Sequence, residues 1–476
     1  MADTPNILWL MDDQHKYNLL SCLGGPMGLT PHLDALAGDG VLFENAYTPS
    51  PVCGPARACL KTGRFPPAHG EIDNWVKLRN GTNAYLPALL RGAGYETAMA
   101  GKLHLSPQGA DYGFEKSWIS DAPYSVYAQE DKTSDYIAWL RKRFFARRGV
   151  DPVKLFDADE LCYDTDLRRF MMGSGFRIKE EHDISWTTQR TVDFLRTRDR
   201  TRPFFFYASF FGPHQPYLAP APYASFCSPD EIRLPASYDD ARRPRGPVFE
   251  GNARETAEHI GKSLTREDAK ALIAANYGQI HMLDEAIGTI LAELRQAGLY
   301  ENTWIVFTSD HGDHLGEHGL FFKGQMYDSC AKVPLILKPA GNFAACRCQQ
   351  TVSTIDLYAT LLDAADAAPA VPDQEGESRS LMPLLRGRCA AWPDSAYSII
   401  GRDPNRALCM LRRKDFKIMR LAKGGKNDAV YEMYDLAHDP QERADLFGNP
   451  DFARRQAELQ ADLDGWFARQ YARYPR

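Results

Sequence analysis

The sequence predicts an α/β protein with a large, mostly parallel central sheet, helices on both of its faces, and a small C-terminal α+β subdomain. Two observations support this prediction. Through the first three quarters of the chain, short apolar segments alternate with segments whose apolar residues recur at helical spacing. The apolar segments are continuous rather than alternating, which is typical of parallel strands that are buried on both faces.

Five strands and three helices are expected in this first part of the chain. The first strand is the apolar run at 6–11, which ends in two aspartates. A helix follows at Thr30-Pro31, where threonine suits the N-cap and proline the first turn, with Leu33 and Leu36 on one face. The further strands are expected at 95–100, 203–211, 303–308 and 333–337, and the further helices at 86–91 and 282–294.

The pattern changes twice along the chain. Between about 118 and 184 the alternation gives way to a stretch rich in Asp, Lys, Arg and aromatic residues. We interpret it as an insertion over the sheet edge, which either shapes substrate access or is a plain surface excursion. After 369–372 the composition changes again, with short strands expected at 396–400, 407–411 and 416–421 and a last helix at 451–468. We therefore expect a catalytic domain at 1–385 and a subdomain at 386–476.

Composition and charge exclude several classes of protein. Of the 476 residues, 44% are hydrophobic and 25% charged, which is typical of a globular protein. The net charge of −6 argues against nucleic acid as the main partner. We find no apolar run of membrane-spanning length and no signal-peptide pattern, so we expect a soluble, cytoplasmic protein without a membrane partner. The ten cysteines are irregularly spaced, unlike a secreted disulfide framework.

Polar side chains follow four of the predicted strands, at the point where each strand ends. The sequence reads DDQ at 12–14, KLH at 102–104, PH at 213–214 and DH at 310–311. In open sheets of this class, sites form beyond the carboxyl ends of the strands. The repeated placement of these residue types therefore predicts a polar site at that edge of the sheet.

The segment CGPAR at 53–57, followed by ACLKTGR, is the sharpest local signal in the chain. Pro55 suits the first turn of a helix, so Cys53 is expected at a helix N-terminus, where the helix dipole favours negative charge. Arg57 adds a fixed cation one turn later. A thiol in that setting is acidified and reactive.

These motifs resemble the type I sulfatases of the alkaline phosphatase superfamily, whose signature is C-x-P-S/A-R followed by a Thr-Gly pair. Phosphonate monoester hydrolases and choline sulfatases are related to that family. The resemblance runs from Asn6 to the segment MYDLAHDPQE at 433–442. It implies an alkaline-phosphatase-like fold and oxidation of Cys53 to formylglycine (3-oxoalanine) by a formylglycine-generating enzyme, with the hydrated aldehyde, bound to a metal ion, as the nucleophile.

The resemblance also implies one divalent metal ion. Its ligands would be Asp13, with Gln14 as a weaker one, residue 53 itself, and the pair Asp310 and His311. Oxygen ligands of this kind suit Ca²⁺ best, and the histidine makes Mn²⁺ an alternative alongside Mg²⁺. Asp12 occupies a position that is usually apolar or small in the family. Three further residues near the second pair are expected to have a supporting, structural role: Asp313, His314 and His318.

Further residues match positions that contact the substrate in the family. Lys102 and His104 form the Gly-Lys-x-His pattern and, with Arg57, would hold the sulfuryl oxygens. His214, in a P-H-x-P pattern and assisted by Lys323, would protonate or stabilise the departing oxygen. Asn74 follows Cys53 by twenty-one residues, a spacing shared with choline sulfatases and phosphonate monoester hydrolases.

The sequence thus predicts a hydrolase of sulfate monoesters, aryl or alkyl, that acts on a small molecule. Two alternatives stay open. One is a phosphonate or phosphate ester hydrolase with the same nucleophile, or an enzyme promiscuous between both reactions; Lys102 and His104 disfavour it. The other is a non-catalytic anion-binding module, which the intact set of site residues disfavours. The sequence leaves the organic part of the substrate and the oligomeric state open, a homo-oligomer included.

Overall fold

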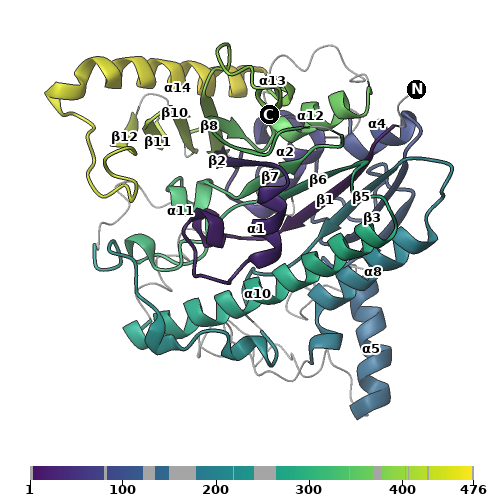
Figure 1. The fold of residues 1–476 in the computed structure, drawn as a ribbon. Coiled ribbons are helices and arrows are strands. Elements are labelled where there is room, and N and C mark those ends of the chain that lie inside the picture. Colours follow the sequence, from purple (N-terminus) through teal and green to yellow (C-terminus); the bar gives the residue numbers. More distant parts are fainter. Residues whose placement is uncertain are drawn as a thin grey trace.

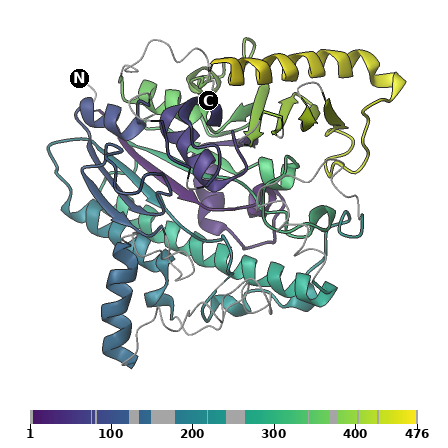
Figure 2. The ribbon, with the colours of Figure 1, turned by 180° about the vertical axis from the view of Figure 1, so that it is seen from behind.

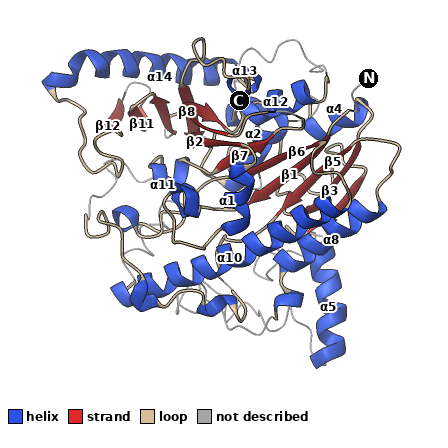
Figure 3. Cartoon of the chain, viewed as in Figure 1, coloured by secondary structure: helices blue, strands red, loops and turns tan. Residues whose placement is uncertain are grey.

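The computed structural model describes residues 4–74, 76–79, 83–121, 134–148, 178–217, 219–240, 264–341, 343–367, 377–401, 404–405, 407–425 and 428–473. This part of the chain forms a large sheet between two layers of helices, with a smaller sheet beside one end (Figures 1 and 3). Most of the insertion expected at 118–184, and the composition change at 369–372, lie outside the described residues. The effect of that insertion on substrate access stays a prediction.

The large sheet has eight strands in the order β4-β3-β5-β1-β6-β7-β2-β8. Only β7 runs against its neighbours, β6 and β2, so the other seven strands of this sheet share one direction. The strands are β1 (Asn6–Asp12), β2 (Val41–Tyr47), β3 (Glu96–Gly101), β4 (Lys116–Ile119), β5 (Phe204–Ser209), β6 (Thr303–Ser309), β7 (Leu335–Lys338) and β8 (Cys346–Ser353).

The central strand β1 shows why its sequence is apolar without alternation. Ile7, Trp9 and Met11 pack into the hydrophobic cluster on one face of the sheet. Leu8 and Leu10 pack into the cluster on the other face. All five side chains are fully buried, so a polar residue at any of these positions would face a core.

Two layers of helices cover the sheet, as the views from the front and from behind show (Figures 1 and 2). One layer consists of α1 (Pro31–Gly38), α8 (Asp183–Thr197) and α10 (Arg266–Gln296). The other consists of α2 (Cys53–Thr62), α4 (Leu86–Gly92), α12 (Asp356–Ala364) and α13 (Met382–Leu385). Besides α14 (Ala453–Arg473) of the second sheet, the described helices outside these layers are α3 (Pro66–His69), α5 (Asp135–Arg148), which extends away from the body, and α11 (Asp328–Ala331).

The second sheet is antiparallel, with the order β12-β11-β10-β9. It contains β9 (Ser395–Ile400), β10 (Leu408–Arg413), β11 (Phe416–Gly425) and β12 (Asp428–Asp435), and α14 (Ala453–Arg473) packs against it. The buried Lys417 of β11 ties this sheet to the larger body, because its Nζ donates to the Met326 carbonyl (2.7 Å) and to Asp328 Oδ1 (2.6 Å).

The predicted fold class is confirmed: a mostly parallel central sheet with helices on both faces and a small C-terminal subdomain. The eight expected strands are present with small shifts at their ends, whereas β2, β4, β8 and β12 were not expected. The helix expected at 282–294 is the second half of α10, which begins at Arg266 behind a capping box formed by Thr265 and Asp268. The domain division at 385/386 stays a prediction.

Among the described residues, every helix is too short or too polar to cross a membrane.

Candidate active site

The carboxyl ends of four neighbouring strands bring the predicted site residues together. Asp12 of β1 lies level with Ser309 of β6, and Met11 lies level with Ser209 of β5. Gly101, the last residue of β3, is also level with Ser209. A Cβ atom on Gly101 would lie 1.7 Å from the Ser209 carbonyl oxygen, so only glycine fits this close approach of two strands. The residues that follow these strand ends therefore surround one point.

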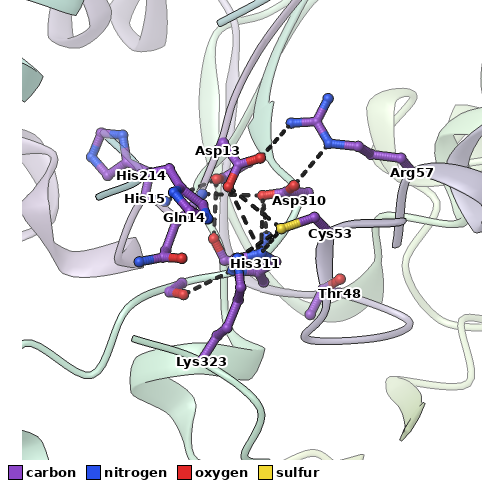
Figure 4. A network of polar contacts seen from close by, with 12 residues as sticks. Asp13, Gln14, His15, Thr48, Cys53, Arg57, His214, Asp310, His311 and Lys323 are labelled. Carbon is purple, nitrogen blue, oxygen red and sulfur yellow. Dashed lines mark hydrogen bonds and ion pairs between the residues drawn. The ribbon is translucent and has the colours of Figure 1, made fainter. Parts of the chain in front are cut away.

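Four of the five predicted metal ligands form a tight, buried cluster (Figure 4). One ligand atom from each of Asp13, Cys53, Asp310 and His311 lies within 4.8 Å of all the others. The Cys53 Sγ is 3.1 Å from His311 Nε2 and 3.7 Å from Asp13 Oδ1. All four side chains are at most 1% exposed. Two carboxylates, an imidazole and a sulfur that converge without solvent are a donor set that fits a divalent cation.

Gln14 is the fifth predicted ligand, and its amide is held from one side. The Nε2 group donates to Asp313 Oδ2 (2.6 Å) and to Gln215 Oε1 (2.7 Å). Its Oε1 atom is buried and accepts no hydrogen bond from the described residues. The backbone N–H of Gln14 donates to Asp310 Oδ1, 3.1 Å away. A buried amide oxygen that accepts no hydrogen bond from the described residues, on the residue directly after Asp13, fits a cation ligand.

Cys53 begins α2, as the sequence predicts. Burial and the Asp13 carboxylate raise the pKa of the Cys53 thiol, but Lys102, Lys323 and His311 outweigh both and hold it below its ordinary value. The Lys323 Nζ donates to the Cys53 Sγ at 2.7 Å. Asn74 lies beside the same helix start, where its Oδ1 accepts from the Gly54 N–H at 2.8 Å. The Cys53 thiol thus lies at a helix N-terminus next to a lysine, in surroundings that favour its ionisation.

The Arg57 guanidinium contacts the two carboxylates from the side away from His311 and Lys323 (Figure 4). Its Nε donates to Asp310 Oδ2 and an Nη atom donates to Asp13 Oδ2, both at 2.9 Å. The other Nη atom donates to Ser209 Oγ and to the Lys102 carbonyl, each at 2.8 Å. The guanidinium is fully buried. Its fork therefore occupies the Oδ2 atoms and leaves both Oδ1 atoms directed at the cluster.

Lys102 and His104 reach the site from the end of β3. The Lys102 Nζ donates to Asp13 Oδ2 at 2.5 Å. His104 has a left-handed backbone with φ of 53°, and its N–H donates to Asp121 Oδ1 at 2.9 Å. Asp121 also accepts from the Leu103 N–H at 2.5 Å. Asp121 could not be predicted from the sequence, since nothing in its sequence neighbourhood indicates that it accepts the backbone N–H groups of residues 103 and 104.

His214 and Lys323 lie on the remaining side of the cluster. His214 Nδ1 is 2.5 Å from the Gln215 carbonyl, which only accepts, so Nδ1 carries the proton of the neutral ring. Burial, with a contribution from Lys323, holds the pKa of His214 well below its ordinary value. Burial lowers the pKa of Lys323, but the charges of Cys53, Asp13 and Asp310 raise it above its ordinary value. The pair therefore combines a neutral imidazole with an ammonium.

Comparison with known proteins gives this cluster a context. Residues 5–367 match the family model described as sulfatase, and residues 316–468 match that of the C-terminal region of N-sulphoglucosamine sulphohydrolase. The chain belongs to the sulfatase family. This chain is 29% identical over 466 residues to an arylsulfatase of Clostridium perfringens, and the match covers 95% of this chain and 92% of that one. It is also 29% identical to an N-acetylglucosamine-6-O-sulfatase of Bacteroides thetaiotaomicron, covering 97% and 86%.

This sulfatase is also similar in structure to a hydrolase of another class of ester. The phosphonate monoester hydrolase of Agrobacterium radiobacter superposes with a TM-score of 0.78 at 25% identity, covering 98% of this chain and 96% of that one. The resemblance inferred from the motifs is thereby confirmed at the level of family and fold. The roles of the individual site residues stay predictions.

Proposed function

We propose that this sulfatase hydrolyses sulfate monoesters with residue 53, in its formylglycine form, as the nucleophile. The observation that supports this most directly is the position of the Cys53 Sγ, among three buried ligand atoms and 2.7 Å from the Lys323 ammonium. Membership of the sulfatase family supports a sulfuric ester as the substrate. Cys53 in this structure stands in for the hydrated aldehyde, whose two hydroxyls would begin at the same carbon that now holds sulfur.

The residues of the cluster fit one divalent cation. Asp13, Asp310, His311 and residue 53 would bind it, and the unsatisfied Oε1 of Gln14 would complete the set. Calcium suits the oxygen ligands best, and manganese or magnesium is the alternative. When bound, such an ion supplies a Lewis acid that lowers the pKa of a hydroxyl ligand and offsets the charge of the ester oxygens.

The side chains around residue 53 would have different roles in the reaction. Lys102 and His104 hold the sulfuryl oxygens while one hydroxyl of residue 53 attacks sulfur and the ester oxygen departs. The sequence predicts that His214, assisted by Lys323, protonates or stabilises that oxygen. Because the His214 ring is neutral with its proton at Nδ1, we propose instead that Lys323 donates the proton or stabilises the oxygen and that His214 orients the oxygen. Loss of the proton from the second hydroxyl then re-forms the aldehyde and expels sulfate. We assign Arg57 to holding Asp13 and Asp310, since its guanidinium is occupied by groups of the chain itself.

A second candidate is a phosphonate or phosphate ester hydrolase with the same nucleophile. The likeness to a phosphonate monoester hydrolase supports it. The CGPAR segment at 53–57 and the pair Asp310 and His311 also favour it. Both reactions pass through a five-coordinate centre with charge on its oxygens, so one site can serve both. Lys102 and His104 favour the sulfate ester.

The experiment compares kcat/KM for an aryl sulfate and an aryl phosphonate in protein matured with a formylglycine-generating enzyme. We expect the sulfate to be preferred and Cys53→Ala to lower turnover by at least about 10³-fold, because no nucleophile remains. Cys59→Ala is the matched control: it changes a buried thiol on the same helix that contacts His69 instead, and it should keep turnover.

Mass spectrometry of the tryptic peptide around residue 53 completes the test. The aldehyde is expected there. An unmodified thiol throughout an inactive preparation would favour the non-catalytic anion-binding module, and high activity in Cys53→Ala would refute the nucleophile. A cytoplasmic location and the oligomeric state stay predictions that this experiment does not address.

A further inference from the structure

Asp313 is a buried carboxylate that the proposed mechanism does not use. It lies two residues after His311 and is fully buried. Its Oδ1 accepts from the N–H groups of Leu315 (3.0 Å) and Phe322 (2.9 Å). Its Oδ2 accepts from Gln14 Nε2 and from the Tyr217 hydroxyl, both at 2.6 Å. Four donors therefore converge on one side chain, and they come from three different loops of the site.

Each of those loops presents a residue of the proposed mechanism. Gln14 follows β1 and is a predicted cation ligand. Tyr217 lies three residues after His214, in the loop that follows β5. Phe322 directly precedes Lys323 in the loop that follows β6. The carboxylate thus joins the cation side of the site to the two residues on the side of the leaving group.

The backbone around Asp313 needs such an anchor. Gln14, Leu315 and Phe322 have φ values of 68°, 43° and 67°, in the left-handed region that is unfavourable for residues with a side chain. Each of the three donates a hydrogen bond to Asp313, from the side chain of Gln14 and from the backbone of the other two. The four hydrogen bonds to Asp313 therefore offset part of the cost of these conformations.

The same carboxylate decides which way the Gln14 amide points. Its neighbour at Nε2 besides Asp313 is the Gln215 Oε1, so both partners are acceptors. Turning the amide over would place an oxygen against two oxygens. The amide oxygen of Gln14 must therefore face the other way, where it is buried and has no hydrogen-bond partner among the residues that the structure describes.

We propose that Asp313 is a positioning residue. It directs the Gln14 amide oxygen toward the cation, and it keeps the loop that carries Lys323 in place beside the loop that carries His214. The proposal rests on the proposed function. It assigns Asp313 no contact with substrate. Its effect reaches the reaction through cation affinity and through the placement of the leaving-group residues.

Two variants separate these effects. Asp313→Ala removes all four acceptor contacts. Asp313→Asn keeps an oxygen for the N–H groups of Leu315 and Phe322 but presents an NH₂ group to Gln14, whose amide must then turn over. The matched control is Asp356→Ala, because Asp356 is also fully buried and accepts from two backbone N–H groups, those of Ser353 (3.1 Å) and Arg379 (2.8 Å), outside the site.

The readouts are the Kd for Ca²⁺ by calorimetry, and kcat and KM for two sulfate esters, one with a good leaving group and one with a poor one. In Asp313→Ala we expect Kd to rise about 10–100-fold, the usual effect of losing a group that orients a ligand. We also expect kcat to fall more for the poor leaving group than for the good one. In Asp313→Asn the Kd should stay raised, whereas the dependence on the leaving group should return toward that of the wild type.

A purely structural role predicts a different outcome: Asp313→Ala and Asp356→Ala would lower thermal stability alike, and both would keep the wild-type Kd and leaving-group dependence. That result would overturn the proposal. So would an Asp313→Asn variant that binds Ca²⁺ as tightly as the wild type. The proposed function is tested separately, by the wild type itself, since a wild type that bound no divalent cation would refute the metal site together with this inference.

Discussion

Replacing Arg57 by methionine tests whether this side chain holds the two ligand carboxylates or contacts substrate. The guanidinium forms two fully buried ion pairs of 2.9 Å, with Asp13 and with Asp310. Removing one partner of a buried ion pair destabilises a protein by about 3–5 kcal/mol, because the other charge stays behind without compensation. Asp13 keeps Lys102 at 2.5 Å, and Asp310 keeps the N–H groups of Gln14 and His311.

Because each carboxylate keeps these partners, we expect Arg57→Met to lower the free energy of unfolding by about 3–5 kcal/mol in total, rather than by that amount for each ion pair. A divalent cation in the cluster should offset part of the loss. The lost charge is +1 and lies directly behind the ligands, so its removal strengthens the attraction between the two carboxylates and the ion. The assay is urea-induced unfolding, in chelator and in excess Ca²⁺. Arg57→Lys keeps the charge without the fork and should lie between the wild type and Arg57→Met.

The result that would refute this reasoning is a loss below about 1 kcal/mol in chelator, the range of an exposed ion pair. A loss of equal size with and without Ca²⁺ would also refute it, because Arg57 would then stabilise something other than the ligand pair. If Arg57 contacted the sulfuryl group instead, Arg57→Met would raise KM and leave the free energy of unfolding nearly unchanged.

Two further predictions concern proton transfer and stability. Lys323→Ala should lower kcat about 10²–10⁴-fold for esters with poor leaving groups and much less for good ones, because a positioned proton donor contributes about that factor; an equal loss for both kinds of ester, measured by steady-state kinetics, would contradict it. Burial raises the pKa of Asp356 to about 6 from an ordinary value of 3.8, against the opposing charge of Arg379. Its folded pKa lies above its unfolded one, so its stabilising effect is complete below about pH 4 and is lost as the pH rises to 6. A shift of about 2 units corresponds to about 3 kcal/mol, and the difference in unfolding free energy between wild type and Asp356→Asn should change by that amount over this range; a constant difference would contradict it.

The strands that were predicted and those that were missed differ in their surroundings. Strands β1, β5 and β6 are buried on both faces, so their composition alone identifies them. The missed strand β8, CRCQQTVS, is at the sheet edge and exposes Cys346 and Gln349, and its sequence resembles that of a loop. The direction of β7 was not predicted either, because a short apolar run such as that at 335–337 reads the same in both directions.

The sequence indicated which residues of the candidate site lie together, but it did not indicate their geometry. Residue types after each strand end indicated Asp13, His214 and Asp310, since the carboxyl edge of a parallel sheet brings such positions together. The Arg57 guanidinium lies on one particular side of Asp13 and Asp310. That side depends on the path of α2, which no sequence spacing encodes. Asp313 was expected only to support its neighbours, because the two loops it joins are 96 and 299 residues away from it at their contact points.

The distribution of backbone strain shows how this site is formed. Nine non-glycine residues of the described chain have positive φ, and five of them lie in the site loops: Gln14, His104, Leu315, His318 and Phe322. A left-handed conformation costs roughly 1–2 kcal/mol per residue, so these loops need stabilising contacts that ordinary loops do not. Asp121 and Asp313 supply them by accepting the backbone N–H groups of His104, Leu315 and Phe322. Both ends of each contact belong to the protein itself, so these contacts stabilise the loops independently of cation or substrate and lower the ordering cost that binding would otherwise have to offset.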